Sequence, residues 1–254
     1  MAMLEFDVRS DLGLVRDENQ DSAGVFPPQA SNDDNESGIL FIVADGMGGH
    51  RGGKEASDIA VKTVHSEYFS NQNGGIGDRL RRAVSSANAA VKAYGDEHIE
   101  CRGMGSTLTA LVLHVGNAVI AHVGDSRAYR ISRSTITQLT EDHSLVASWE
   151  RNGWLTAEQA RVHPERSLLY RALGVKDEVE VDLIEGISLE ENDCVVLCSD
   201  GLSNHVNDSE IFATVAGSRP EEACGKLIAL ALERGGSDNV TVVTVKVIDR
   251  NGDR

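Results

Sequence analysis

The sequence predicts an α+β fold in which groups of antiparallel strands are separated by pairs of helices. Segments with strand character occur near the N-terminus, in the middle of the chain and near the C-terminus, and segments with helical periodicity occur in pairs between them. A doubly wound sheet would instead alternate single strands and helices. No GxxxxGK[ST] motif follows any predicted strand, which also argues against a P-loop fold.

The first strands are indicated by alternation and by apolar runs. Residues 4–9 alternate apolar and charged side chains, the period of a half-buried strand. A second short strand is expected within 14–26, and the polar stretch 27–38 connects it to the next strand. That strand, ILFIVAD at 39–45, is continuously apolar and therefore buried on both faces. It leads into a glycine-rich corner, GMGG, at 46–49.

Two helices are expected after this corner. Residues 53–70 place Ala56, Ala60 and Val64 on one face, and residues 78–98 carry a similar apolar stripe. The sequence NQNGGIG between them ends the first helix.

The rest of the chain returns to strands and then adds two more helices. Strands are expected at 105–115, 117–131 and 134–140, with Gly116-Asn117 as a hairpin signal. Residues 142–173 are expected to be mostly helical and polar, with two short helices at 142–153 and 156–164. The last predicted elements are strands at 178–186, 192–200 and 239–249, with helices from about Asp208 and from Pro220 before the final strand.

Composition limits the classes of function. The chain has 254 residues and 41% hydrophobic residues, which suits a single domain spanning 1–254. A net charge of −16 without a run of Lys and Arg argues against nucleic-acid binding. No apolar run reaches the roughly 20 residues that span a bilayer. With no secretory signal and four cysteines outside any CxxC pair, we expect a cytoplasmic protein with free thiols, no membrane partner and a monomeric state.

Carboxylates recur at or beside strand ends, in turn-prone sequence. They are Asp21, Asp45, Asp125, Asp200 and Asp238. Each alone is ordinary turn chemistry. Together, at one end of a sandwich, they would repel one another unless protonated or bound to cations. Because the recurring residues are all carboxylates and none is Cys or His, the ligand set would be hard oxygen, which suits Mg²⁺ or Mn²⁺, and two such ions suit displacement at phosphorus.

The glycine corner after Asp45 has two interpretations. Its backbone N–H groups could cradle a phosphate, or it could be a tight turn that lets Asp45 and a backbone carbonyl bind a metal. The absence of strict strand–helix alternation weakens the first interpretation.

Eight motifs, taken together, identify a family. In order they are VRDENQD, ADGMGGH, MGSTL, HVGDSRAY, LTEDHSLV, RALG, CSDGLS and GGSDNVTVV. The chain resembles the bacterial type-2C (PPM-type) metal-dependent Ser/Thr protein phosphatases from about Phe6 to Val247. The resemblance implies a four-layer αββα sandwich of two antiparallel sheets flanked by helix pairs, with a small helical flap at about 143–166.

The resemblance also implies a function and a metal centre. The expected reaction is hydrolysis of phosphoserine and phosphothreonine in proteins, by a metal-bridging hydroxide that attacks phosphorus in line. Asp45 would bridge two Mn²⁺ or Mg²⁺ ions, and Gly46 would add its carbonyl to one of them. Asp200 and Asp238 would bind the other ion, and Asp21 would hold metal-bound water.

Other roles implied by the resemblance lie at the edge of the centre. Arg16 would grip the phosphate, and Asp125 would bind a weaker third ion. Two positions depart from the pattern. Met47 stands where other members have a proposed general-acid His, with His50 offset from it, so the acid is unassigned. Asn204 stands where an Asp often assists the third ion.

Alternatives stay open on substrates and on catalysis. The substrates would be phosphorylated proteins, either Ser/Thr kinases and their substrates or an anti-sigma-factor antagonist. A non-catalytic binding module of the same fold is the competing class, although such proteins usually lose metal carboxylates and none is lost here. Trp149 and Trp154 in the flap could contact substrate or pack, and packing is expected for at least one of them.

Overall fold

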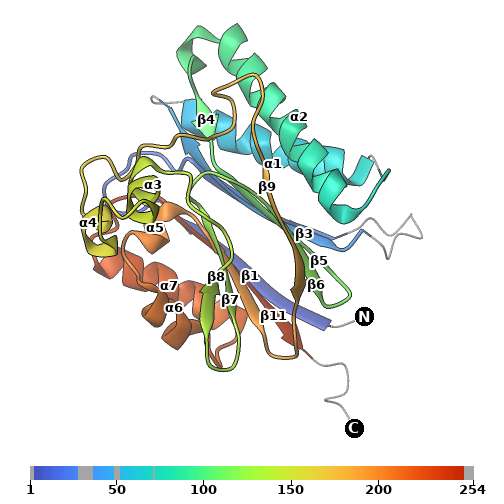
Figure 1. Ribbon diagram of the computed structural model, residues 1–254, viewed down its shortest axis with the longest axis vertical. Coiled ribbons are helices and arrows are strands. Elements are labelled where there is room, and N and C mark those ends of the chain that lie inside the picture. Colours follow the sequence, from blue (N-terminus) through green and yellow to red (C-terminus); the bar gives the residue numbers. More distant parts are fainter. Residues whose placement is uncertain (1–2, 28–36, 49–51, 71, 249–254) are drawn as a thin grey trace.

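Two antiparallel sheets pack face to face between two groups of helices (Figure 1). The computed structural model describes residues 3–27, 37–48, 52–70 and 72–248. This arrangement confirms the four-layer αββα sandwich. Most of the predicted connection 27–38 and the position of His50 lie outside the described residues.

The first sheet has five strands in the order β1-β11-β10-β7-β8. These strands are β1 (Met3–Asp11), β11 (Val240–Ile248), β10 (Cys194–Cys198), β7 (Arg127–Ile131) and β8 (Ile136–Gln138). The second sheet has the order β2-β3-β5-β6-β9, with the short β4 paired to β3. Its strands are β2 (Asp21–Phe26), β3 (Ile39–Met47), β4 (Gly105–Ser106), β5 (Leu108–His114), β6 (Asn117–Val123) and β9 (Asp182–Ser188).

Helices cover the outer face of each sheet (Figure 1). The second sheet is covered by α1 (Gly52–Ser70) and α2 (Ile76–Glu97), with the 3₁₀ turn η1 (Ile99–Cys101) after them. The first sheet is covered by α5 (Asp200–Ser203), α6 (Asp208–Val215) and α7 (Pro220–Glu233). No helix in the described ranges has the length and apolar character that crossing a membrane requires.

The continuous apolar run of β3 is explained by burial on both faces. Leu40, Ile42 and Ala44 pack in the cluster under α1 and α2, whereas Phe41 and Val43 pack in the cluster between the sheets. Successive side chains of a strand point to opposite faces, so alternate residues enter different cores. A strand between two layers therefore needs no polar side.

The same period places the cysteines of β10. Cys194 and Cys198 both face the cluster beneath α7, which contains Cys224, while Val195 and Leu197 face the other sheet. The expectation that the two β10 thiols share a face is confirmed. All four cysteines are buried, and none of them forms a disulfide within the described residues.

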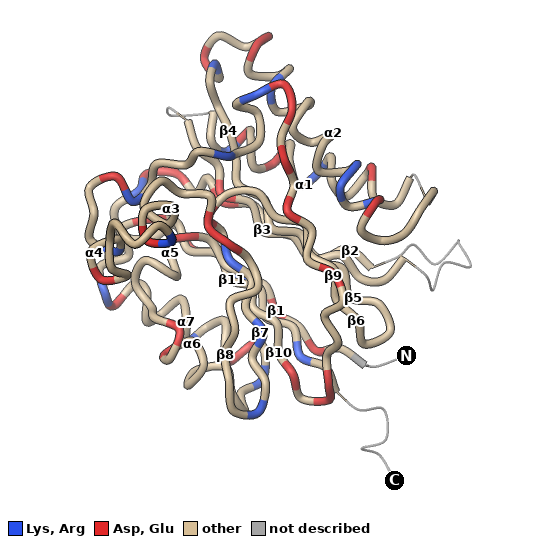
Figure 2. Tube along the Cα trace, viewed as in Figure 1, with Lys and Arg blue, Asp and Glu red and all other residues tan. Residues whose placement is uncertain are grey.

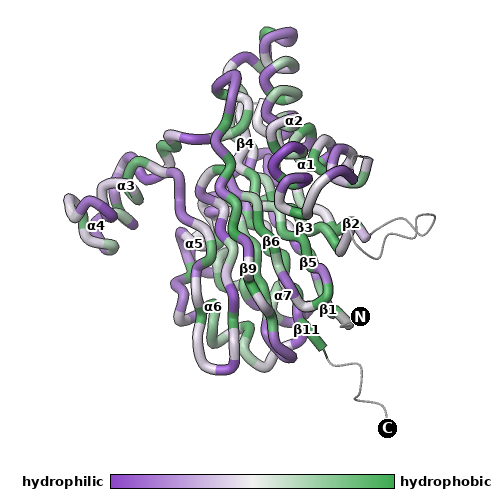
Figure 3. Tube along the Cα trace, turned by 45° about the vertical axis from the view of Figure 1, so that its right-hand side comes forward, coloured by the Kyte–Doolittle hydropathy of each residue, from purple (hydrophilic) through white to green (hydrophobic). Residues whose placement is uncertain are grey.

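The segment 142–173 is less helical than expected. It contains α3 (Leu145–Arg151) and α4 (Ala157–Arg161), and the rest is turns and extended chain. Gly153, at φ +73°, lies in the turn that separates the two helices. Thr156 then starts α4 with a capping box to Gln159. Figure 3 shows α3 and α4 standing away from the sandwich as a separate flap.

Several strand boundaries also differ from the sequence prediction. The run 117–131, expected as one strand, is divided into β6 and β7, which lie in different sheets. The hairpin between β5 and β6 turns at Val115 and Gly116, both with positive φ, one residue before the predicted pair. Strand β9 begins at Asp182 rather than at residue 178, because its neighbour β6 ends at Val123 and His122 is the last residue that pairs with it.

Candidate active site

Asp21 and Asp45 are brought together by strand pairing. They are opposite partners on β2 and β3. The Asp45 backbone N–H donates to Thr107 Oγ1 (2.9 Å), and its carbonyl accepts from Thr107 N–H (2.8 Å). Asp45 lies within β3, two residues before its end, and not at the strand end as the sequence suggested. Its orientation is set by both neighbouring strands.

Asp200 and Asp238 come from the other sheet. Asp200 is the first residue of α5, two residues after the end of β10, and Asp238 lies two residues before β11, which pairs with β10. Between them, Ser199 connects the two sheets. Its hydroxyl donates to Asp21 Oδ2 (2.7 Å) and accepts from Thr241 N–H (2.9 Å).

The predicted site residues surround one pocket of about 190 Å³. Its lining includes Arg16, Asp45, Gly46, Asp125, Asp200 and Asp238. Asp21 is the exception: it is 3% exposed, does not line the pocket and lies behind Asp45. The sandwich thus gathers all seven predicted residues at one edge.

Burial and mutual repulsion change the proton affinities of this cluster. The pKa of Asp21 is raised to about 7, mainly because burial disfavours the charged form, and hydrogen bonds from Thr241 and Ser199 oppose the rise. Burial is also the main cause of the raised pKa values of Asp45, Asp125 and Asp200, and neighbouring carboxylates add to it. Without a cation, these groups cannot all be ionised at low cost.

Two oxygen atoms of the cluster are buried without a partner in the part of the chain that is described. They are Oδ1 of Asp21 and Oδ1 of Asp200. Buried carboxylate oxygens without a partner are costly unless a cation or water binds them. Both belong to the residues that were predicted to serve a metal centre.

Gly46 is required by close backbone packing. A Cβ atom there would lie 1.9 Å from the Gly53 carbonyl oxygen and 2.8 Å from that of Gln20. The corner is held by a bond from Gly46 N–H to the Gln20 carbonyl (3.2 Å). Only glycine lets the chain pass between α1 and the loop before β2 while remaining at the pocket.

Arg16 reaches the pocket from the loop before β2. Its Nη2 donates to Asp238 Oδ2 (2.7 Å), and this bond is the main cause of its raised pKa. Its side chain is 53% exposed. The guanidinium is therefore at the mouth of the pocket, where an incoming anion can reach it.

The residues present fit a hard divalent cation, although they do not form a ready cage. Among the residues described, no group of three or more His, Cys, Asp and Glu side chains has the arrangement of a metal site. Two features explain this. The Asp238 carboxylate is turned toward Arg16, and the expected contribution of Gly46 is a backbone carbonyl. The donor set is all oxygen, which matches Mg²⁺ or Mn²⁺.

Sequence reasoning missed several positioning residues. Thr107 and Ser199 hold Asp45 and Asp21, yet both are small hydroxyl residues whose bonds cross between strands distant in sequence. Asn239 is a third positioning residue: its Nδ2 donates to the carbonyls of Leu12 and Glu18, while its Oδ1 accepts from Gln20 N–H. These bonds hold the loop that carries Arg16.

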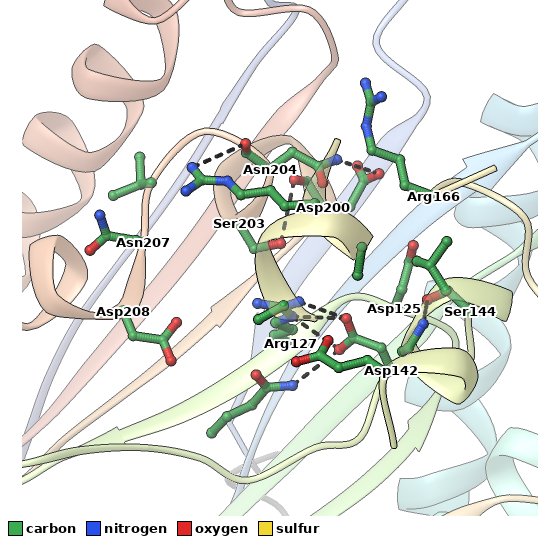
Figure 4. Close-up of a pocket in the computed structure, with 18 of the residues that line it drawn as sticks. Asp125, Arg127, Asp142, Ser144, Arg166, Asp200, Ser203, Asn204, Asn207 and Asp208 are labelled. Carbon is green, nitrogen blue, oxygen red and sulfur yellow. Dashed lines mark hydrogen bonds and ion pairs between the residues drawn. The ribbon is translucent and has the colours of Figure 1, made fainter. Parts of the chain in front are cut away.

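A second hollow of about 570 Å³ adjoins the first beneath the flap (Figure 4). The two share Asp125 and Asp200. In Figure 4, Asn204 Nδ2 donates to Asp200 Oδ2 (3.0 Å), and Arg127 pairs with Asp142 (2.7 Å). Asn204 therefore serves as a donor that orients a site carboxylate.

The flap tryptophans differ in exposure. Trp149 is half-buried and packs edge-on against His163, with ring centroids 5.2 Å apart. Trp154 is 72% exposed. Packing of at least one tryptophan is confirmed.

Comparison with known proteins agrees with this fold. A family model described as protein phosphatase 2C matches residues 16–223. The chain is 38% identical to the serine/threonine phosphatase stp of Listeria welshimeri over 245 residues, which cover 94% of each chain. The chain belongs to the protein phosphatase 2C family.

Solved structures show the same likeness. The serine/threonine phosphatase PstP/Ppp of Mycobacterium tuberculosis is 36% identical with a TM-score of 0.85, covering 96% of this chain and 99% of that one. A PstP catalytic domain in complex with two manganese ions is 34% identical with a TM-score of 0.81, covering 97% of this chain and 99% of that one.

Proposed function

We propose that this protein is a metal-dependent serine/threonine protein phosphatase that hydrolyses phosphoserine and phosphothreonine in phosphorylated proteins. The observation that carries the proposal is the convergence of Asp45, Gly46, Asp200, Asp238 and Arg16 on one pocket, in a member of the protein phosphatase 2C family. Its relatives named above are themselves called serine/threonine phosphatases.

The donor set indicates which residues would hold the metal. Asp45, Asp200, Asp238 and the backbone carbonyl of Gly46 would hold two divalent ions. The buried, unpartnered Oδ1 atoms of Asp21 and Asp200 support this assignment. When bound, two such ions would lower the pKa of water and neutralise charge on a phosphoryl group. Mn²⁺ and Mg²⁺ both suit the donor set, and Asp125 would hold a weaker third ion.

The chain's own side chains bind and orient the substrate. Arg16 exchanges its bond with Asp238 for the phosphate oxygens, because a guanidinium forks onto two oxygens of a phosphate. Met47 lines the same pocket and carries no transferable proton, so a water or another acid protonates the leaving serine or threonine oxygen.

For the molecule as a whole, we propose that residues 1–254 form one catalytic domain, monomeric and cytoplasmic, with a flap at about 143–166 beside the site. In the view of Figure 2, Lys and Arg are interspersed with Asp and Glu, which supports protein rather than nucleic-acid substrates. Ser/Thr kinases, their substrates and an anti-sigma-factor antagonist all fit as phosphorylated partners.

The test is hydrolysis of a phosphothreonine peptide with and without divalent metal. We expect turnover in Mn²⁺ or Mg²⁺, none in EDTA, and a loss of at least about 100-fold in Asp200→Asn, because removal of a metal carboxylate removes electrostatic stabilisation of the transition state. Asp177→Asn, at a side chain that is 93% exposed, is the matched control and should be unchanged. Full activity in Asp200→Asn would refute the metal assignment.

A non-catalytic binding module is the second class of function. All the core carboxylates are present, which favours the enzyme. Binding of phosphopeptides without turnover in millimolar Mn²⁺ would favour the binding module instead.

A further inference from the structure

His143 is a buried histidine at the foot of the flap that the proposed chemistry does not use. It is 2% exposed. Its ring lies between His122, at 4.9 Å between centroids, and Tyr170, at 5.7 Å. Both ring nitrogens have polar contacts, and the contacts lead to different parts of the molecule.

One side of His143 holds the turn that carries Asp125. The His143 backbone N–H donates to the Gly124 carbonyl (2.8 Å), and Gly124 N–H donates to Nδ1 of the His143 ring (3.0 Å). Gly124 has φ +112°, in the region that favours glycine, and a Cβ there would lie 2.6 Å from Thr107 Cβ. The turn is therefore fixed by tight packing on one face and by the imidazole on the other.

The backbone of His143 also begins the flap. Its carbonyl accepts from Tyr170 N–H (3.0 Å), and Leu145 N–H donates to the Leu168 carbonyl (2.8 Å). The outgoing and returning segments of the flap thus pair at this residue. Ser144, the next residue, caps α3 through its side chain.

The other ring nitrogen is anchored to β9 and to the returning segment. Nε2 lies 3.0 Å from Asp182 Oδ2 and 3.0 Å from Arg171 Nη1, and Arg171 Nη1 donates to Asp182 Oδ1 (2.6 Å). Because Nδ1 accepts from Gly124 N–H, a neutral ring carries its proton on Nε2 and donates it to Asp182, while Arg171 Nη1 donates to the other oxygen of the same carboxylate. The Asp182 carboxylate is thus shared between the imidazole and Arg171, a residue that follows the flap.

We propose that His143 is a positioning residue with two separate attachments: Nδ1 holds the turn that carries Asp125, and Nε2, together with the His143 backbone, holds the foot of the flap. The proposal deepens the proposed phosphatase function, because Asp125 faces the pocket and the flap covers the adjoining hollow. The imidazole is suited to this role because its two nitrogens face opposite ways, one as an acceptor and the other as a donor.

Two substitutions separate the two ring nitrogens. In His143→Asn, the side-chain oxygen can stand near Nδ1 and accept from Gly124, but the side chain is too short to reach Asp182. In His143→Gln, the amide can reach Asp182 and leaves Gly124 N–H without its acceptor. The readout is hydrogen exchange of the Gly124 amide, followed by NMR in the metal-free full-length protein, so it does not depend on turnover.

We expect Gly124 exchange to rise about 10-fold or more in His143→Gln and to stay near the wild-type rate in His143→Asn, because loss of one hydrogen bond of this kind corresponds to about that factor. Equal Gly124 exchange in both variants would overturn the proposal. If His143→Gln does not fold, Asp182→Asn takes its place: it should keep Gly124 protected and speed exchange across 145–168. No change at 145–168 would overturn the attachment of the flap through Nε2.

Steady-state kinetics connect His143 with catalysis. With a phosphopeptide and Mn²⁺, we expect Asp182→Asn to raise KM about 3- to 10-fold with little change in kcat, and His143→Gln to lower kcat as well. If both variants lose stability without this difference between KM and kcat, the role of His143 is structural alone and the proposal is overturned. If the wild type shows no turnover, the proposed function fails while the exchange result still stands, so the two failures are distinguishable.

Discussion

At Gly46, the absence of a Cβ atom decides whether the pocket can form. The backbone passes between the Gly53 and Gln20 carbonyls with no space for a side chain. The two neighbouring positions carry the chemistry of the corner, with Asp45 in the cluster and Met47 at the rim. Arg16 and Ser199 each act through one hydrogen bond. Arg16 donates to Asp238 from the loop before β2, and Ser199 donates to Asp21 of the other sheet.

Gly46→Ala should destabilise the protein by about 3 kcal/mol, because the new methyl group meets backbone atoms that cannot rotate away. Urea unfolding monitored by circular dichroism measures this change. Gly75→Ala is the matched control, since its φ is −71° and a Cβ there meets nothing within 4 Å. An equal loss in both variants would contradict the packing argument.

Arg16→Lys should lower kcat/KM for a phosphopeptide by about 10- to 100-fold, because a single ammonium cannot reproduce two parallel bonds to phosphate. Steady-state kinetics at saturating Mn²⁺ measures the effect. Arg133→Lys, at an exposed position distant from the pocket lining, is the control. Unchanged kinetics in Arg16→Lys would remove Arg16 from phosphate binding.

At the scale of elements, pairs of strands and helices bring together groups that are distant in sequence. β2 and β3 set Asp21 opposite Asp45, and β10 with β11 sets Asp200 beside Asp238. The outer helices hold these sheets in place. Arg79 of α2 is an unusual part of that packing, because it is 5% exposed and lies 4.3 Å from the ring of Tyr68 of α1.

Arg79→Met should destabilise the protein by about 2 kcal/mol, because the Tyr68 carbonyl and the Ser37 hydroxyl lose their donor in a buried site. Thermal unfolding measures this. Arg81→Met, on the same helix with a 55% exposed side chain, should change stability by less than about 0.5 kcal/mol. A similar small change in both variants would show that Arg79 is not part of the helix-pair packing.

Local patterns in the sequence predict much of the fold but only part of the candidate site. The apolar run at 39–45 and the helical stripes after it predict their elements because period and burial are local properties. The carboxylates were found through their motifs, but the support from Thr107, Ser199 and Asn239 depends on which strands become neighbours. In the segment 142–173 the two short helices and the break at Gly153 were predicted, but both helices are shorter than expected and the rest is turns and extended chain.

At the scale of the whole molecule, buried polar groups make stability depend on pH. Burial, with His143 nearby, lowers the pKa of His122 to about 4, and its ring contacts Thr109 Oγ1 and the Glu141 carbonyl. A histidine whose folded-state pKa is depressed binds fewer protons when folded than when unfolded. Its contribution is therefore fully present above about pH 6.5 and is lost as the pH falls toward 4.

Wild-type protein should lose up to about 3 kcal/mol from His122 between pH 7 and pH 4, and His122→Gln should lack this part of the slope. Urea unfolding at a series of pH values in EDTA measures both, and the difference between the two slopes isolates His122 from the carboxyl cluster. Parallel slopes would mean that His122 does not sense pH in the folded state.

The central claim is that the carboxylate cluster is a metal centre, and calorimetric titration of the metal-free protein with Mn²⁺ tests it most directly. The account predicts at least two Mn²⁺ ions bound per chain at neutral pH, and loss of at least one of them in Asp45→Asn, with Asp177→Asn unchanged. Absence of stoichiometric binding, or full binding in Asp45→Asn, would contradict it.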